Sequence, residues 1–258
     1  MWNFINITHD KEKRLYWIEL NRPEKHNAFS DEMMDEIKAA LNDAEQMKDA
    51  LVVIFTGKGK VFASGADIKE LNAMSPLDAL FPRMQTLYQQ IYNFPKTTVA
   101  AVDGYALGGG MELAAACDIR IATERSKFGL PECKLGVIPG AGGTQRLVKL
   151  IGEAKVKELI FLGDMLKAHE ALQLGFISRL VDVDVFRQQT ESIALQITEK
   201  APMALRLAKQ CIQRQAEIPI EVGMLLENLS QSYLFTTNDK NEGVTSFIEK
   251  RNPVFSGK

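Results

Sequence analysis

Two glutamates and the glycine-rich segments beside them are the residues of this chain with the clearest chemical potential. Glu112 follows three consecutive glycines in "GYALGGGMELAAACDIRIA", residues 104–122, and Glu132 lies twenty residues later in "FGLPECKLG". Two carboxylates beside one water molecule can divide the work, because repulsion and desolvation separate their pKa values, so that one activates water while the other supplies a proton. The alternative interpretation is that both are ordinary solvated surface charges.

The glycine cluster predicts a backbone that some other group approaches closely, because glycine inside a helix costs about 0.5–1 kcal/mol relative to alanine. A strand followed by glycines and a helix presents unpaired N–H groups, which can bind a small anionic oxygen. In "FASGAD", residues 62–67, a second glycine turn offers the amide of Ala66 as another donor. Two amides directed at one oxygen would form an oxyanion hole, each lowering a barrier by about 2.7–4 kcal/mol.

Neither glycine segment fits a phosphate-binding loop. "GGGMEL" lacks the lysine and hydroxyl residue that such a loop carries at the helix start, and "PGAGGTQR" lacks the third glycine of the dinucleotide fingerprint. Cys117, Cys133 and Cys211 form no CxxC pair. We therefore expect no metal and no disulfide, and a reducing compartment, the cytoplasm, is the default.

Composition indicates an ordinary globular protein without a general attraction to polyanions. The 258 residues are 46% hydrophobic and 25% charged, with a formal net charge of −2. This charge predicts neither a nucleic-acid partner nor binding to an anionic membrane. No apolar run is long enough for a membrane span, and "MWNFINITHD" does not resemble a signal peptide.

Strand and helix signals alternate along most of the chain and predict an α/β fold. Residues 4–9, 14–21, 50–57, 97–104 and 118–123 have the composition of strands, whereas 57–67 is predicted to be a loop. Ser30 is expected to cap a helix whose residues Met33, Ile37, Leu41 and Ala44 face the core, and residues 68–94 are expected to be helical with breaks near Pro76 and Pro82. The alternation favours parallel strands joined by helices.

The chain changes character towards its end, where only helices are predicted. They cover residues 185–200, 202–215, 219–235 and 239–250. We place a boundary near residue 195, which gives a core region 1–195 and a helical region 196–258. The apolar faces of these helices favour an oligomer, and the alternative is that they pack on the chain's own core.

Several long motifs resemble the enoyl-CoA hydratase (crotonase) superfamily over essentially the whole chain. They are "LNRPEKHNAFS", "GKVFASGADIKEL", "AVDGYALGGGMELAAACDIRIA", "FGLPECKLGVIPGAGGTQRL" and "EGVTSFIEKRNPVF". The resemblance implies a crotonase-like spiral of ββα units followed by a C-terminal helical oligomerisation region, assembled as a homotrimer or as a homohexamer made of two trimers. It also implies a coenzyme A thioester as substrate, with no cofactor and no metal.

The resemblance also implies roles for individual residues. The amides of Ala66 and Gly109 would hold the thioester carbonyl oxygen, and Glu112 and Glu132 would be the catalytic pair. Further substrate or coenzyme A contacts would come from Lys25, Ala28, Ser64, Asp67, Ile68, Lys69, Gly108, Gly140 and Lys250, the last reaching the nucleotide of a neighbouring subunit. The sequence departs from the family pattern at Ser64, where alanine is common, and at Glu24, where some relatives have a basic residue.

The implied activity is that of an enoyl-CoA hydratase, which adds water reversibly to trans-2-enoyl-CoA and gives 3-hydroxyacyl-CoA in fatty acid β-oxidation or related acyl-CoA breakdown. An enoyl-CoA isomerase and a hydratase specialised for branched or aromatic acyl groups remain alternatives within the superfamily. Isomerases generally manage with one carboxylate, so the presence of both Glu112 and Glu132 favours hydration. A non-catalytic RNA-binding use of the fold is a further alternative, which would require a basic stripe.

Overall fold

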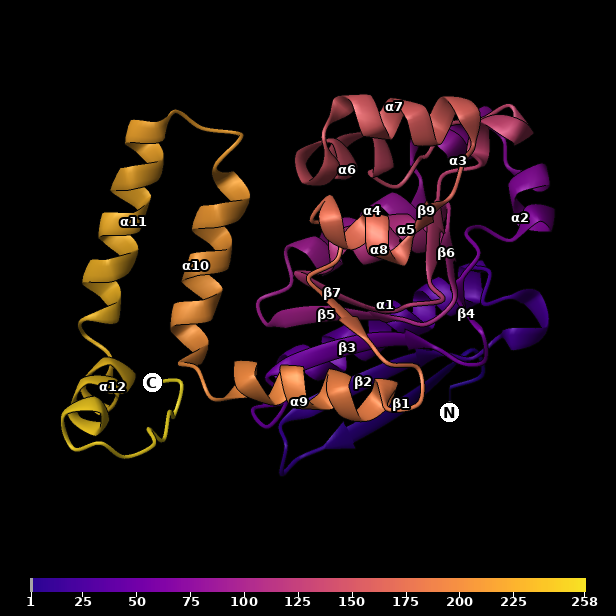
Figure 1. Cartoon of the computed structure of the whole chain (residues 1–258). Coiled ribbons are helices and arrows are strands. Elements are labelled where there is room, and N and C mark those ends of the chain that lie inside the picture. Colours follow the sequence, from indigo (N-terminus) through magenta and orange to yellow (C-terminus); the bar gives the residue numbers. More distant parts are fainter. Residues whose placement is uncertain (1) are drawn as a thin grey trace.

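The computed structural model describes residues 2–258 and has the predicted α/β architecture (Figure 1). Residue 1, where the predicted core region begins, lies outside the described residues. The first sheet has the strand order β1-β2-β3-β5-β7-β10, in which β1 and β2 are antiparallel and the other neighbours are parallel. Its strands are β1 (Ile5–Asp10), β2 (Leu15–Leu20), β3 (Val52–Gly57), β5 (Thr97–Val102), β7 (Ile119–Thr123) and β10 (Arg179–Val181).

A second sheet of short strands has the order β4-β6-β8-β9. Its strands are β4 (Val61–Ala63), β6 (Tyr105–Leu107), β8 (Lys127–Gly129) and β9 (Leu166–Lys167). Along the chain β3 is followed by β4, β5 by β6 and β7 by β8, and helical segments come after each pair. Because each pair repeats the direction of the previous one, the repeated strands β3, β5 and β7 run parallel in the first sheet and β4, β6 and β8 run parallel in the second, whereas β9 is antiparallel to β8. This is the spiral of ββα units that the resemblance implies, and that prediction is confirmed.

The helices of the spiral match the sequence predictions up to residue 116, whereas no helix was predicted between residues 124 and 184. They are α1 (Asp31–Gln46), α2 (Ile68–Ala73), α3 (Pro76–Leu80), α4 (Arg83–Tyr92), α5 (Gly109–Ala116), α6 (Gly143–Ile151), α7 (Glu153–Leu162) and α8 (Ala168–Gln173), with short 3-10 turns η1 (Pro23–Lys25) and η2 (Glu132–Leu135). The Ser30 hydroxyl caps α1 by accepting a hydrogen bond from Met33 N at 3.3 Å. The two proline breaks are confirmed, since Pro76 begins α3 and Pro82 precedes α4.

The structure corrects one local prediction. Residues 57–67 were expected to form a loop, yet β4 occupies positions 61–63 within them. A strand of three residues is too short to show an alternating pattern, and its pairing with β6 comes from residues more than forty positions away. The short strands β6 and β8 escape local sequence signals for the same reason.

The central strands of the first sheet are buried on both faces. Val53 and Phe55 of β3 belong to one apolar cluster, which also includes the inner faces of α1 and α4. Val52 and Ile54 point the other way, into a second cluster with the partly buried apolar residues of α9 (Phe186–Thr198). Successive side chains of a strand point to opposite faces, so one short strand serves two cores.

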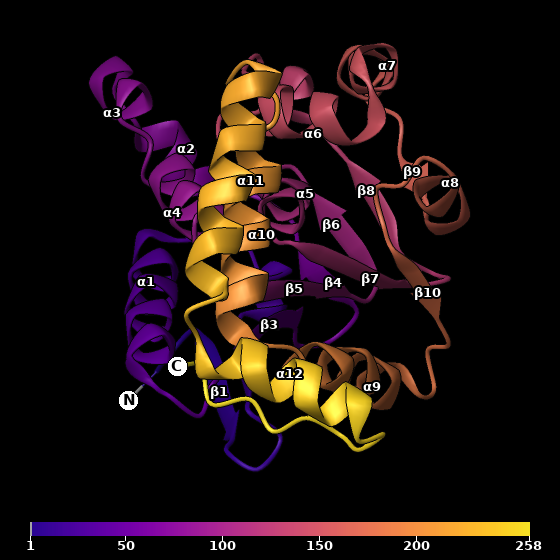
Figure 2. The ribbon, with the colours of Figure 1, turned by 90° about the vertical axis from the view of Figure 1, so that its left-hand side faces the viewer.

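The C-terminal helices leave the core after α9 (Figures 1 and 2). They are α10 (Pro202–Arg214), α11 (Ile220–Leu234) and α12 (Asn238–Ile248). The predicted boundary at 195/196 falls inside α9, whose Ala194 is fully buried against the first sheet. The division of the chain into two domains stays a prediction. Within residues 2–258, none of the helices combines the length and apolar character needed to cross a bilayer.

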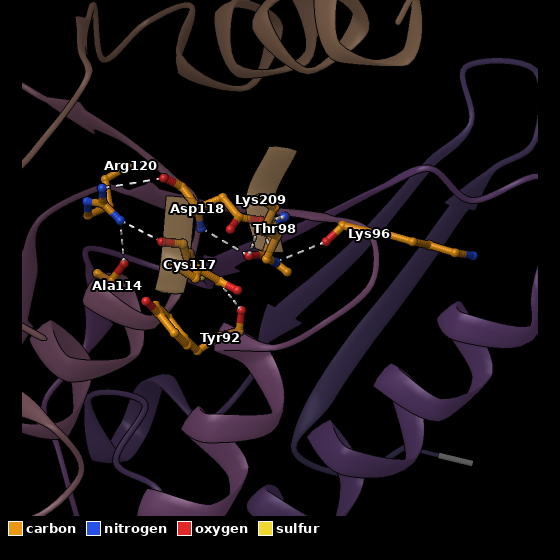
Figure 3. Close-up of polar contacts among 9 residues, drawn as sticks. Tyr92, Lys96, Thr98, Ala114, Cys117, Asp118, Arg120 and Lys209 are labelled. Carbon is orange, nitrogen blue, oxygen red and sulfur yellow. Dashed lines mark hydrogen bonds and ion pairs between the residues drawn. The ribbon is translucent and has the colours of Figure 1, made fainter. Parts of the chain in front are cut away.

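A polar network fixes α10 to the edge of the core (Figure 3). Lys209 Nζ of α10 lies 2.8 Å from Asp118 Oδ2. The same carboxylate oxygen accepts hydrogen bonds from the amide and the hydroxyl of Thr98, at 2.8 Å and 3.0 Å. Next to it, the buried Arg120 guanidinium donates to the carbonyl oxygens of Ala114 and Cys117 at the end of α5. One ion pair and its hydrogen bonds therefore link α10 to the starts of β5 and β7.

Candidate active site

Each of the three glycines at the start of α5 leaves room for a different neighbour. Gly108 has φ +53° and ψ −125°, a conformation that other residues rarely adopt. A Cβ atom on Gly110 would lie 2.2 Å from Ala63 O at the end of β4. A Cβ on Gly109 would lie 2.6 Å from Met84 Sδ of α4. The glycines therefore let the start of α5 approach β4 and the loop that follows it.

Two backbone amides without protein acceptors lie in these adjoining segments. Phe29 N donates to Gly65 O at 2.8 Å and Asp67 N donates to Phe29 O at 2.9 Å, so the parallel bridge directs the amide of Ala66 to the opposite side. Gly109 is the first residue of α5, where an amide has no partner within the helix. In the described chain, neither amide donates to a protein acceptor. A Cβ on Gly65 would lie 3.2 Å from Gly109 N, which shows how close the two segments are.

Glu112 is buried in the first turns of α5, with 2% of its surface exposed. Its Oε1 atom accepts hydrogen bonds from Ala141 N at 2.8 Å and Gly143 N at 2.7 Å. Gly143 begins α6, so the carboxylate lies at a helix N-terminus, where negative charge is stabilised. Burial raises the pKa of Glu112, while the two amides and the positive charge of Arg146 lower it.

Glu132 approaches the same region from η2. Its Oε1 atom lies 3.0 Å from the position of a Cβ on Gly108, beside the start of α5. Its Oε2 atom is buried and has no hydrogen-bond partner within residues 2–258. Burial, together with the negative charge of Glu112, raises the pKa of Glu132 to about 7. A buried polar atom without a protein partner is suited to bind water or a substrate group, and this carboxyl can exchange a proton near neutral pH.

Several residues predicted to contact substrate lie close to Ala66 in the chain and in space. Asp67 caps α2 by accepting from Lys69 N at 2.9 Å, and it pairs with Arg22 Nη1 at 2.8 Å. The charge of Lys25 contributes to lowering the pKa of Asp67, after the larger effects of the Lys69 amide and Arg22. Ala28 adjoins the Phe29 bridge, Ser64 and Ile68 flank the Ala66 turn, and 58% of the Ile68 surface is exposed.

The remaining predicted contacts differ in their placement. Gly108 precedes α5, and Gly140 lies in the loop whose next residue, Ala141, donates to Glu112. Lys250 follows α12, on the opposite side of the molecule from α2 (Figure 1). The structure therefore brings every predicted site residue of the spiral to one region and leaves Lys250 apart from it.

Sequence reasoning missed four contributors to this region. Arg22 holds Asp67, Met84 covers Gly109, and Ala141 and Gly143 bind the Glu112 carboxylate. From the segment "PGAGGTQR", which does not fit a phosphate loop, the sequence predicted a substrate contact at Gly140 but no contact with Glu112. Its amides do bind an anion, but the anion belongs to the protein itself. A signal existed in the sequence, because the free amides of a helix start can bind an anion and Glu112 is an acidic residue beside another glycine-rich segment.

The spiral of ββα units thus places two backbone amides without protein acceptors near the carboxyls of Glu112 and Glu132. The family description that matches residues 10–258 is "Enoyl-CoA hydratase/isomerase". The chain belongs to this family.

Individual relatives match over almost their full length. A probable enoyl-CoA hydratase of Mycobacterium bovis is 40% identical, with 98% of each chain covered. The short-chain-enoyl-CoA hydratase of Clostridium acetobutylicum is 37% identical, with 95% of each chain covered. The crystal structure of an enoyl-CoA hydratase from Bacillus anthracis superimposes with a TM-score of 0.93 at 35% identity, covering 99% of this chain and 100% of the other.

Proposed function

We propose that this protein is an enoyl-CoA hydratase, which adds water reversibly to trans-2-enoyl-CoA and forms 3-hydroxyacyl-CoA. The observation that carries the proposal is the juxtaposition of two kinds of group. The amides of Ala66 and Gly109 have no protein acceptor. The Glu132 carboxyl lies beside Gly108 and the Glu112 carboxyl beside Gly143, and the charge of Glu112 is near enough to raise the pKa of Glu132. Isomerisation generally needs one carboxylate, whereas hydration uses two.

The amides act on the thioester. Attack of water at C3 of the conjugated double bond moves an electron pair to C2 and the carbonyl, so negative charge develops on the thioester oxygen. Donors from Ala66 and Gly109 bind this oxygen more strongly in the transition state than in the ground state. Both donors are backbone groups held by the Phe29 bridge and by α5, so little reorganisation is needed during the reaction.

The carboxyls act on water and on C2. Glu112 and Glu132 orient the water molecule, whose oxygen forms the new bond to C3 and whose proton passes to the carboxylate of Glu112. Glu132 gives its proton to C2, and solvent exchange then restores both groups. The pKa of about 7 for Glu132 suits this role, because a catalytic acid is most effective when its pKa lies near the working pH.

The primary test measures loss of absorbance of the conjugated thioester with crotonyl-CoA. We expect hydration by the wild type and a fall of about 10²–10⁴-fold in Glu112→Ala and in Glu132→Ala, the range typical of general acid–base catalysis. A wild type that converts only 3-enoyl-CoA into conjugated thioester would replace the proposal with an isomerase. Full hydration by both variants would remove the carboxyls from the mechanism.

The Gly109 amide can be tested with a matched pair of variants. Gly109→Pro deletes the N–H at the first helical position, where proline is well tolerated, and should lower kcat by about 10²–10³-fold. Gly109→Ala keeps the N–H and adds a Cβ whose close contact, 2.6 Å from Sδ, is with the flexible end of Met84, while Gly65 Cα lies at an ordinary contact distance of 3.4 Å. Equal losses in both variants would indicate a packing effect and contradict a role for the amide.

The setting of the reaction is also part of the proposal. We propose that coenzyme A is bound through Lys25 and Lys69, with Lys250 contributed by a neighbouring subunit of a homotrimer or homohexamer, and that no cofactor is needed. Exposed apolar residues on α11, including Met224, Leu225 and Leu229, support such an assembly. Cys117, Cys133 and Cys211 are free, which is consistent with the cytoplasm. Sedimentation of the wild type and of Leu225→Asp would test the assembly.

A further inference from the structure

Arg146 of α6 is a half-buried cation that forms no direct ion pair within residues 2–258. Its Nη1 atom donates to Ala141 O at 2.8 Å, and its Nη2 atom donates to Gln89 Oε1 of α4 at 2.8 Å. Its guanidinium also stacks over the ring of Tyr92, with Cζ 5.2 Å from the ring centroid. Burial of a cation is costly, and three contacts that fix its orientation without neutralising its charge require an explanation.

The contacts of Arg146 end on the loop that binds Glu112. Ala141 receives the guanidinium hydrogen bond through its carbonyl oxygen and donates its own amide to Glu112 Oε1. Gly142, the next residue, has φ +104°, and a Cβ there would lie 2.1 Å from Arg146 Nη1. The glycine therefore leaves room for the guanidinium against the loop, and the amide of Gly143 follows as the second donor to Glu112.

We propose that Arg146 is a positioning residue for Glu112: it fixes the 139–143 loop so that its amides meet the carboxylate, and it keeps a positive charge near that carboxylate. This inference rests on the proposed hydratase function. Glu112 accepts the proton of water only as a carboxylate, and its burial opposes that charge state. The two amides and Arg146 supply the opposing stabilisation, and Arg146 itself touches no reacting atom.

Other groups that face Glu112 do not provide this charge. From α4, Tyr88 is fully buried with an unpartnered hydroxyl, and burial holds its pKa well above the usual value, so it remains neutral. From η2, the carboxyl of Glu132 is repelled by Glu112 when both are ionised. Arg146 from α6 is the group that lowers the pKa of Glu112 through its charge. Loss of Arg146 should therefore raise the pKa of Glu112.

The test compares the pH dependence of kcat/KM for crotonyl-CoA hydration in Arg146→Met, Arg146→Lys and Gln89→Ala. Arg146→Met removes the charge and the hydrogen bonds of the guanidinium. We expect kcat/KM to fall by about 10–100-fold, because small displacements of a catalytic group lower the rate by this much. The acidic limb of its profile should move to higher pH. Arg146→Lys keeps the charge, so its acidic limb should stay near that of the wild type even if its rate falls. Gln89→Ala removes one contact of the guanidinium and should give a smaller loss with the limb unmoved.

Lys149→Met is the matched control, because Lys149 is a cation of the same helix that faces Glu217 at 3.6 Å. It should leave both rate and profile unchanged. A profile in Arg146→Met that keeps the wild-type acidic limb, or that moves equally in Lys149→Met, would overturn the inference. Arg146→Lys and Gln89→Ala both keep the positive charge. Should Arg146→Met fail to fold, an acidic limb that moves to higher pH by the same amount in these two variants would also overturn the inference.

A direct titration separates this inference from the hydratase proposal. In protein labelled with ¹³C at the glutamate carboxyl, the Glu112 signal is assigned by its disappearance in Glu112→Gln. We expect this signal to titrate at higher pH in Arg146→Met or, if that variant does not fold, in Arg146→Gln than in the wild type. An unchanged titration overturns the role of Arg146 whatever the substrate is, whereas absence of hydration by the wild type contradicts only the proposed function.

Discussion

Replacing Glu132 by glutamine should make the stability of the protein less dependent on pH. The pKa of Glu132 is raised from 4.5 to about 7 in the folded chain, mainly because burial disfavours its charge. Between these two values the folded state keeps a proton that the unfolded state has lost. The stabilisation is therefore complete below pH 4.5 and is lost as the pH rises through about 7. Glutamine has nearly the same shape as glutamate but does not ionise, so the variant lacks this contribution to the pH dependence.

The magnitude follows from the same two pKa values. Each unit by which the pKa of one group differs between the folded and the unfolded state changes the free energy of unfolding by about 1.4 kcal/mol. The difference between 4.5 and about 7 therefore corresponds to about 3 kcal/mol. The Glu132 side chain is partly exposed, and solvent screening reduces the expected value to about 2–3 kcal/mol. When the pH rises from 4.5 to 8, the free energy of unfolding of Glu132→Gln should therefore increase by this amount relative to that of the wild type.

Urea unfolding of both proteins at pH 4.5 and pH 8, at one fixed protein concentration, measures this difference. All other titrating groups are shared and cancel, and a fixed concentration removes the effect of assembly. The activity of Glu132→Gln should fall at the same time, because glutamine cannot supply the proton that the proposed reaction takes from Glu132. A difference between the two proteins that changes by less than about 0.5 kcal/mol over this range would refute an elevated pKa, because one shifted unit already gives about 1.4 kcal/mol.

Three further substitutions test the packing that holds the site. Gly110→Ala would place Cβ 2.2 Å from Ala63 O, so we expect a loss of stability of about 1–3 kcal/mol, typical of overpacking, measured by urea unfolding. Lys209→Met removes the 2.8 Å pair with Asp118 and should cost about 1–3 kcal/mol, and adding Asp118→Asn should recover part of this cost in a double-mutant cycle. Ser30→Ala removes the cap of α1 and should cost about 1 kcal/mol in the same assay, with no change in hydration kinetics.

The long elements could be predicted from the sequence because their signals are local. The Ser30 cap, the buried face of α1 and the proline breaks depend on residues within one or two helical turns. The short strands could not be predicted, because β4 exists through its pairing with β6 and has only three residues. Three residues are too few to show the alternation of apolar and polar side chains that is typical of a strand.

The residues of the candidate site also differ in whether the local sequence could identify them. Glu112 and Glu132 were identified from their neighbouring glycines, which are local features. Their partners were not, because Ala141 is 29 positions from Glu112 and meets it only through the spiral. Arg146 likewise stands out only through its contacts with Ala141 and Gln89, which lies 57 positions away in the chain. Local sequence shows which groups carry charge, and the fold decides which of them are neighbours.

The bridge between Phe29 and Ala66 has an evolutionary consequence. It aims the Ala66 amide by means of main-chain atoms alone, since Gly65 O and Asp67 N take up the bonds on the other side. Substitutions that exchange side chains around this turn therefore leave the direction of the Ala66 amide unchanged, so the surroundings of this donor can vary while the donor itself is kept.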